Sequence, residues 1–463
     1  MLVLINNCHD IARQPKLLCA RQRTVENKKI DLMRCRVASI PLLNHGIMPP
    51  NASRFDRIKK GSAMPDLLLS AADLAWPITI ALAWIVGEVG SRYTGLPRIS
   101  LYGVLGFAAA QTGYLPHSES SSVVLLANIA FGLVLFEFGY RINLNWLRTN
   151  PWIGVTGLAE SVGTFGAVFA CAQWYGTTLM TALLLASLMM ATSPAGILNV
   201  INEQRSSGQV TERILHLTAL NCVLAVFAFK VILGFWVFQS SGSLWHAVSS
   251  SLSVLLVSAT LGAFFGILIP AILRALGLLA PDATIAFALT VILLVSITHT
   301  GKLSPVLATL TFGLVARHSR VALSQTQRNF GALGELLSVL LFVYVTSTLQ
   351  WRHIMAGAEL AMLLILVRFG TKIVASALFA RVGGITWRKG ALTGMALAPI
   401  SVFVVLMLEQ ARYLGLGLVD ELSALAAVTP VLEVLGPVIT QHALVWAKET
   451  PRPHSHPSTT LET

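Results

Sequence analysis

The sequence predicts an all-α membrane protein with about thirteen transmembrane helices arranged in two matching halves. Its 463 residues are 55% hydrophobic and only 12% charged, and the mean hydropathy of +0.71 excludes a soluble globular protein. Apolar runs follow one another from about residue 66 to 447, and one run in each half is interrupted by a proline. These three observations carry the predicted fold class.

Thirteen apolar runs suit a membrane crossing, which needs roughly 20 mostly apolar residues. Short polar joints separate them. The shortest are the second, from Leu101 to Gly113, and the ninth, from Leu303 to Val315. The predicted helices are centred near residues 78, 105, 131, 163, 188, 226, 262, 291, 310, 340, 367, 398 and 433.

Two of these runs are not expected to form continuous helices. Pro194 interrupts one in the sequence MATSPAG, and Pro399 interrupts the other in ALAPIS. Proline removes a backbone donor and clashes with the carbonyl group one turn earlier, so the helix kinks or unwinds. Each break alone is also typical of an ordinary proline kink. As a pair in corresponding halves they indicate the substrate site of a transporter.

Basic residues are concentrated in alternate joints. Fifteen Lys and Arg residues follow the odd-numbered predicted helices, and three follow the even-numbered ones. Because cytoplasmic joints carry the excess of basic residues, we expect a multi-pass protein of the cell inner membrane with a cytoplasmic C-terminus. The net charge of +12 therefore reflects orientation in the lipid bilayer and requires no nucleic acid as partner.

The two ends of the chain are expected to lie outside the membrane domain. Residues 1–63 carry twelve Lys and Arg but no apolar run long enough to span, although the first helix is expected to start outside the cell. We interpret this basic leader as disordered or as a wrongly assigned start, with Met64 or Met48 as the true one; a cytoplasmic regulatory arm is the alternative. Residues 64–447 form the predicted transmembrane domain, and 448–463 a short cytoplasmic tail.

Three joints resemble motifs of a known transporter superfamily. They read LPRISLYG at residues 96–103, LFEFGYRIN at 135–143 and LSPVLA at 303–308. With their order, their spacing and the two broken helices, the chain from about residue 66 to 447 resembles the sodium/hydrogen exchanger-like membrane domain of the monovalent cation/proton antiporter superfamily.

This resemblance implies an architecture and an activity. The fold would consist of inverted repeats, with two crossed broken helices in a core bundle and a second bundle that forms a homodimer. The core would move against the second bundle and exchange Na⁺ or K⁺ for H⁺ by secondary active transport. The sequence has no catalytic or nucleotide-binding motif, so we expect a transporter that is not an enzyme and has no cofactor or metal site.

The chain departs from the family where the ion should bind. Family members carry an Asp-Asp or Asn-Asp pair on the sixth helix, and the second Asp binds the cation or the proton. Their fifth helix often has Thr-Asp-Pro. The matching positions here are Asn221-Cys222 and Thr192-Ser193-Pro194. Cys222 is typical of a small buried residue and is a poor ligand for a hard cation. We expect Asn221, Thr192 and Ser193 to donate oxygen ligands, or else to satisfy backbone groups freed at the break.

Charged residues within the predicted helices supply the remaining candidates. Arg368 and Lys372 are four residues apart and share a helix face, where intramembrane charges are costly and usually functional. We expect them to balance acids of the core, although Lys372 could instead reach the cytoplasmic surface. Glu160 is the first substitute for the missing Asp, and Glu433 is expected to pair with Arg368.

Three functions remain open from the sequence. Antiport of H⁺ against Na⁺ or K⁺, with Glu160 in the role of the missing Asp, leads because of the resemblance. A basic core with two half-helix N-termini also suits proton-coupled or anion-selective transport. A membrane sensor that does not transport is the third.

Overall fold

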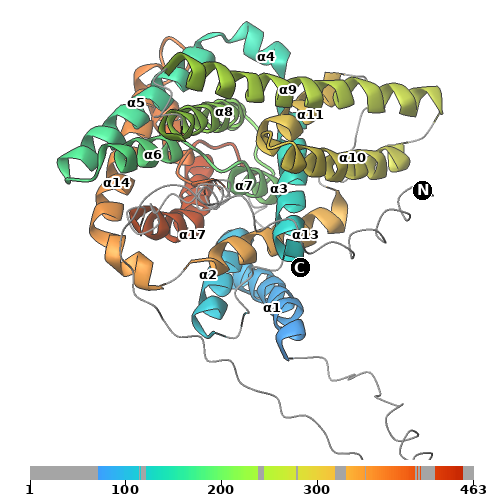
Figure 1. Ribbon diagram of the computed structural model, residues 1–463, viewed down its shortest axis with the longest axis horizontal. Coiled ribbons are helices and arrows are strands. Elements are labelled where there is room, and N and C mark those ends of the chain that lie inside the picture. Colours follow the sequence, from blue (N-terminus) through green and yellow to red (C-terminus); the bar gives the residue numbers. More distant parts are fainter. Residues whose placement is uncertain are drawn as a thin grey trace, which may run out of the picture. The chain divides into compact units, whose positions relative to one another are not determined.

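The computed structural model describes residues 71–113, 115, 121–237, 244–277, 280–318, 330–349, 351–401, 404, 407 and 423–451. All of them belong to one unit, Leu68–Thr463, and every regular element among them is a helix (Figure 1). The predicted leader (1–63) and the tail from residue 452 onward lie outside the described residues.

Each of the thirteen predicted segments contains a helix. In chain order the helices are α1 (Ala71–Thr94), α2 (Arg98–Gln111), α3 (Ser121–Arg141), α4 (Leu144–Thr149), α5 (Trp152–Trp174), α6 (Leu179–Met189), α7 (Pro194–Gln204), α8 (Gln209–Val237), α9 (Leu244–Ala275), α10 (Ala280–Thr300), α11 (Pro305–His318), α13 (Gly331–Ser347), α14 (Trp351–Leu378), α15 (Trp387–Ala396) and α17 (Ser423–Trp446). Within the described ranges, nine stretches are long and apolar enough to cross a membrane. The all-α membrane fold is confirmed, and the number of crossings stays a prediction.

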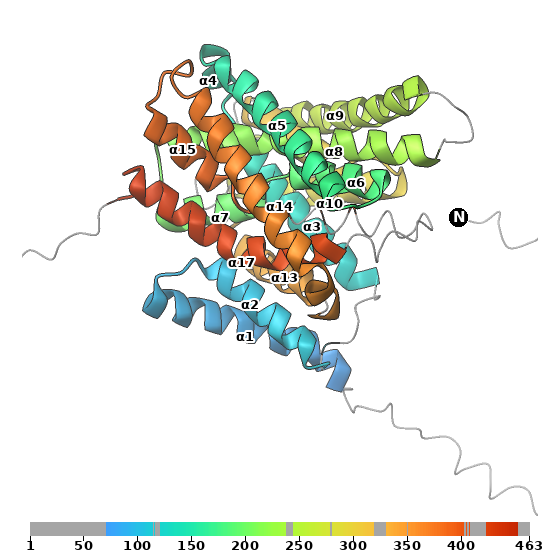
Figure 2. The ribbon, with the colours of Figure 1, turned by 90° about the vertical axis from the view of Figure 1, so that its left-hand side faces the viewer.

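The helices pack in two groups (Figures 1 and 2). In the outer bundle, α2 packs on α1 and α13, α3 on α10, α11 and α13, and α9 on α11. In the core bundle, α14 packs on α5, α15 and α17, and α8 packs on α5, α6, α7 and α15. The two bundles meet where α2 contacts α17, α3 contacts α7 and α8 contacts α9.

The outer bundle is held together by close contact between helices. A Cβ atom added to Gly313 of α11 would collide with the carbonyl oxygen of Phe136 on α3, so the two backbones touch there. The Phe136 ring is fully buried and lies 4.8 Å from the Phe312 ring and 5.3 Å from that of Phe287, centroid to centroid. Small residues that allow such contact are typical of membrane helix interfaces.

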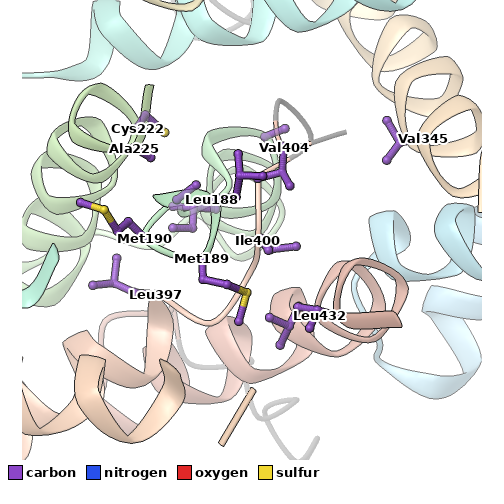
Figure 3. Packing of buried hydrophobic residues seen from close by; sticks show 14 of the residues in the cluster. Leu188, Met189, Met190, Cys222, Ala225, Val345, Leu397, Ile400, Val404 and Leu432 are labelled. Carbon is purple, nitrogen blue, oxygen red and sulfur yellow. The ribbon is translucent and has the colours of Figure 1, made fainter. Parts of the chain in front are cut away.

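The two proline breaks meet inside the core bundle. The chain leaves helical geometry between Met189 and Pro194, and again from Leu397 to Ser401. The backbone N–H of Ser193 donates to the carbonyl oxygen of Pro399 at 3.1 Å, so the predicted crossing of the two broken helices is confirmed. Figure 3 shows the buried side chains around it, with Met189, Ile400 and Leu432 close together.

Local sequence explains where helix α7 resumes after the first break. Pro194 occupies its first position, where the missing N–H has no helical partner to lose. Ser193 is the N-cap, and its hydroxyl oxygen accepts a hydrogen bond from the Gly196 N–H at 3.0 Å. Of the two roles expected for Ser193, the structure therefore shows the satisfaction of a freed backbone group.

Candidate functional site

Five of the carbonyl groups at the two breaks are satisfied by one side chain, that of Arg368 on α14. The side chain is 1% exposed, and its guanidinium donates to carbonyl groups on both broken helices. The acceptors are the carbonyl oxygens of Met189 (3.0 Å), Ala191 (2.9 Å), Leu397 (3.3 Å), Ala398 (2.6 Å) and Pro399 (3.2 Å). Buried backbone groups must find such partners, so Arg368 is the link between the two crossing segments.

The predicted pairing of Glu433 with Arg368 is absent from the described structure. The Arg368 donors are taken by main-chain carbonyls, and neither carboxylate oxygen of Glu433 has a hydrogen-bond partner. The prediction was wrong because it matched charge with charge. It overlooked the carbonyl groups that two unwound segments present to a guanidinium with five N–H donors.

Lys372, one turn after Arg368, forms a fully buried ion pair with Glu160 of α5. Its ammonium also donates to the carbonyl oxygen of Met190 and to the Thr192 hydroxyl, both at 3.3 Å. The side chain thus points into the crossing, which answers the alternative that it reaches the cytoplasmic surface. The ammonium is surrounded by a carboxylate, a hydroxyl and a carbonyl oxygen.

Asn221 of α8 completes this cluster from the opposite side. Its amide nitrogen donates to the Thr192 hydroxyl at 3.0 Å, and its amide oxygen accepts from the Ser161 hydroxyl at 2.8 Å. Asn221, Thr192 and Ser161 are all fully buried. The predicted polar residues of α8 and of the first break therefore lie together, beside Glu160 and Lys372.

Cys222 contributes a hydrogen-bond donor at the first break. The thiol is 1% exposed and donates to the carbonyl oxygen of Thr192 at 3.2 Å, so it too satisfies a backbone group freed at the break. Figure 3 shows it on α8 beside Ala225, at the edge of the hydrophobic packing. The geometry agrees with the expectation of a small buried residue.

The cluster contains oxygen atoms that are still available. The Glu160 Oε2 atom is buried without a hydrogen-bond partner in the described structure. The Thr218 hydroxyl, about one turn before Asn221 on α8, is buried and unpartnered as well. The Thr164 hydroxyl donates to the other Glu160 oxygen at 3.3 Å. A buried set of carboxylate, hydroxyl, amide and carbonyl oxygens is the kind of environment that hard cations prefer.

Sequence reasoning missed three members of this cluster: Ser161, Thr164 and the Met190 carbonyl. Ser161 and Thr164 lie within one turn of Glu160 in an otherwise apolar run, which was a usable signal. The Met190 carbonyl carries no side-chain signal at all. Among the described residues, no three His, Cys, Asp or Glu side chains are close enough to hold a metal ion together.

Comparison with known proteins gives the fold a family. Residues 78–446 match the model of the family described as sodium/hydrogen exchanger, transmembrane. No curated protein matches the chain in sequence.

Solved structures of the sodium proton antiporter MjNhaP1 from Methanocaldococcus jannaschii share the fold. One, at pH 8, has a TM-score of 0.59 at 14% identity and covers 82% of this chain and 98% of that one. An electron-microscopy structure has a TM-score of 0.58 at 17% identity, over 80% and 94%. Since the family model also extends over most of the sequence, from α1 to α17, the chain belongs to the sodium/hydrogen exchanger family of membrane proteins.

Proposed function

We propose that the chain is a secondary active transporter that exchanges a monovalent cation for protons at the Glu160–Lys372 pair. Membership of the sodium/hydrogen exchanger family supports this activity. The observation that carries the site is the position of the Lys372 ammonium, held by the Glu160 carboxylate, the Thr192 hydroxyl and the Met190 carbonyl. These are the oxygens that a bound Na⁺ or K⁺ would need.

Competition for these oxygens would make the exchange obligatory. A monovalent cation carries the same charge as the ammonium and can take its place beside Glu160. Two positive charges a few ångströms apart repel strongly in a buried site, so Lys372 must release its proton when the cation enters. The site then holds either a protonated lysine or a cation. It carries the cation across the membrane in one direction and the proton in the other.

We further propose that Cys222 stands where the family has its ion-binding Asp, and that Glu160 has taken over the role of that acid. Cys222 offers its proton to a carbonyl group and no charged oxygen to a cation. Glu160 supplies the buried carboxylate from α5, close to the same Thr192 and Asn221. The exchange chemistry is thereby kept with a different acid.

Anion transport receives less support from this geometry. Both core bases are already engaged, Arg368 by carbonyl oxygens of the two breaks and Lys372 by Glu160. An anion would have to displace these partners before it met a positive charge. The proposed substrate is therefore a monovalent cation. In the transport assay, anions serve as the comparison.

The proposed location and oligomeric state of the transporter are supported by other features. The excess of Lys and Arg in alternate joints supports the inner membrane with a cytoplasmic C-terminus. The resemblance to the antiporter superfamily supports a homodimer formed by the outer bundle. The transport assay distinguishes Na⁺ from K⁺ as the exchanged cation.

The test is a dye-reported pH change when Na⁺, K⁺ or anions are added to inverted vesicles. Glu160→Gln should abolish the cation response, because no carboxylate remains to bind the ion. Cys222→Ser should leave it largely intact, because a hydroxyl can still donate to the Thr192 carbonyl. Glu359→Gln is the matched control, because Glu359 accepts a hydrogen bond from the Tyr175 hydroxyl at the end of α5, away from the crossing.

Cys222→Asp should create or strengthen a Na⁺- or K⁺-dependent release of protons, since Asn221 and Thr192 already lie beside position 222. A wild type without any cation response, together with a responsive Cys222→Asp variant, would show that the natural chain has left cation antiport. Transport of an anion, or a sensor role, would then replace the proposal.

A further inference from the structure

Glu433 of α17 is a buried acid that the site described above does not use. It is 2% exposed, and both carboxylate oxygens lack a hydrogen-bond partner in the described structure. An ionised carboxylate isolated from water and from any partner is very costly, whereas its protonated form is far less so. A side chain in this position therefore has a reason to bind a proton.

The packing of α17 brings the helix face that carries Glu433 against the second break. A Cβ atom on Gly436 would lie 2.6 Å from the Cα atom of Pro399, so the two backbones touch. One turn further along, the Thr440 hydroxyl donates to the carbonyl oxygen of Ala396 at 2.9 Å. Residues 433, 436 and 440 are spaced three and four apart and share one face of the helix.

The two segments run in opposite directions, which fixes the level of Glu433. Thr440 lies against Ala396, and Gly436, one turn earlier in α17, lies against Pro399. Glu433 is about one turn earlier again, which brings it to the level of Ser401. The Ser401 hydroxyl is fully buried and also has no hydrogen-bond partner. Two unpartnered polar groups, an acid and an alcohol, thus lie at the same level of the crossing.

No charged group in the described structure neutralises Glu433. Helix α17 packs against α2, α7, α14 and α15. The titratable side chains described on these helices and on α17 form no hydrogen bond or ion pair with it; they are Arg98, Tyr102, Glu203, Glu359, Arg368, Lys372, Arg388, Lys389 and His442. The two core bases, Arg368 and Lys372, are engaged by carbonyl oxygens and by Glu160 respectively.

We propose that Glu433, with Ser401, is a second proton-binding site of the exchange, separate from the Glu160–Lys372 pair. The inference rests on the proposed function and adds a second proton carrier to it. With Glu433 protonated, the charges of Glu160, Lys372, Arg368 and Glu433 sum to one positive charge before the cation enters, when Lys372 is charged. The sum is the same afterwards, when the cation has replaced the Lys372 proton. Release of the Glu433 proton brings this sum to zero and lowers the cost of burying the cation.

Two protons are exchanged for each cation. When the cation enters, an N–H bond of Lys372 and the O–H bond of Glu433 break, and both protons pass to water on the side from which the cation comes. When the cation leaves on the other side, both groups take up protons there. Wild type should therefore move one proton more per cation than a variant without the Glu433 carboxyl.

Infrared difference spectroscopy tests the proton on Glu433 without any transport. The purified wild type should show the carbonyl-stretch band of a protonated carboxylic acid, and the band should be lost in Glu433→Gln and kept in Glu160→Gln. Ser401→Ala should shift it, because the hydroxyl lies at the same level of the crossing as the acid. Addition of the transported cation to the wild type should diminish the band, a measurement that needs no variant to fold.

The number of protons exchanged per cation tests the role of Glu433 in transport. In proteoliposomes with a clamped membrane potential, Glu433→Gln should keep exchange, release one proton fewer per cation and lose the voltage dependence of the wild type. An unchanged ratio and voltage dependence would overturn the proposal, as would an infrared band unaffected by Glu433→Gln. A wild type that exchanges no cation would instead overturn the proposed function, and the infrared band would still decide whether Glu433 holds a proton.

Discussion

Arg368 shows how one side chain can hold two interrupted helices in place. Its guanidinium replaces the N–H donors that the breaks at Pro194 and Pro399 remove, and it does so for both segments at once. A lysine could not do the same, because an ammonium has three donors around one nitrogen and lacks the planar fork of arginine. The two breaks therefore depend on the residue type at position 368 as well as on its charge.

Replacing Arg368 should destabilise the protein even when charge is kept. Arg368→Lys should leave at least two buried carbonyl groups without donors, at about 1–3 kcal/mol for each. Arg368→Met should cost more still. The measurement is the midpoint of thermal unfolding in detergent. Arg274→Lys is the control, because Arg274 donates to Pro270 within its own helix; equal midpoints for Arg368→Lys and Arg274→Lys would contradict this account.

At the scale of single elements, the start of α8 is capped by Glu449, a residue that follows α17. The Glu449 carboxylate accepts hydrogen bonds from the backbone N–H groups of Val210 and Thr211, both at 2.8 Å, and from the Thr211 hydroxyl at 2.9 Å. The first N–H groups of a helix have no partner within it, and a carboxylate there also interacts favourably with the helix dipole. Lys389 of α15 lies 3.6 Å from the same carboxylate.

Glu449→Ala should therefore destabilise the protein, by about 2–3 kcal/mol, since it removes a charged cap from buried N–H groups. Chemical unfolding followed by tryptophan fluorescence measures the change. Glu335→Ala serves as the control, because Glu335 is half-exposed and its pair with Arg98 at 3.4 Å is of the surface kind, worth at most about 1 kcal/mol. A loss no larger than that of the control would show that other groups cap α8 equally well.

The elements were predictable from the sequence because their signals are local. Apolar runs and joints place a helix in every predicted segment, and Pro194 and Pro399 mark the breaks. The contacts that build the site are not local. Lys372 meets Glu160 across 212 positions, and Glu449 meets Val210 across 239, and no spacing rule links such residues. Glu433 was assigned the wrong partner for the same reason.

At the scale of the whole molecule, the core and outer bundles are joined by polar contacts at helix α7. Asn202 donates to Glu137 of α3 at 3.1 Å and accepts from Arg141. Glu203 accepts from the Ser91 hydroxyl at 3.1 Å and from the Arg98 N–H at 3.3 Å, on α1 and α2. Since α7 is half of a broken helix, these contacts tie the site to the outer bundle. Alternating access by motion of the core would have to break them.

Cross-linking α7 to α3 should therefore stop transport. In a variant whose native cysteines are replaced by serine, the pair Glu137→Cys and Asn202→Cys would be joined by a flexible bis-methanethiosulfonate reagent, which forms a reducible disulfide bond with each cysteine. The control pair, Gln111→Cys and Leu349→Cys, lies within the outer bundle, where Gln111 donates to the Leu349 carbonyl at 3.1 Å. Exchange should cease after cross-linking of the first pair, return on reduction and persist in the control. Exchange that continues through a complete cross-link between α3 and α7 would mean that these helices move together, and that the moving boundary lies elsewhere in the fold.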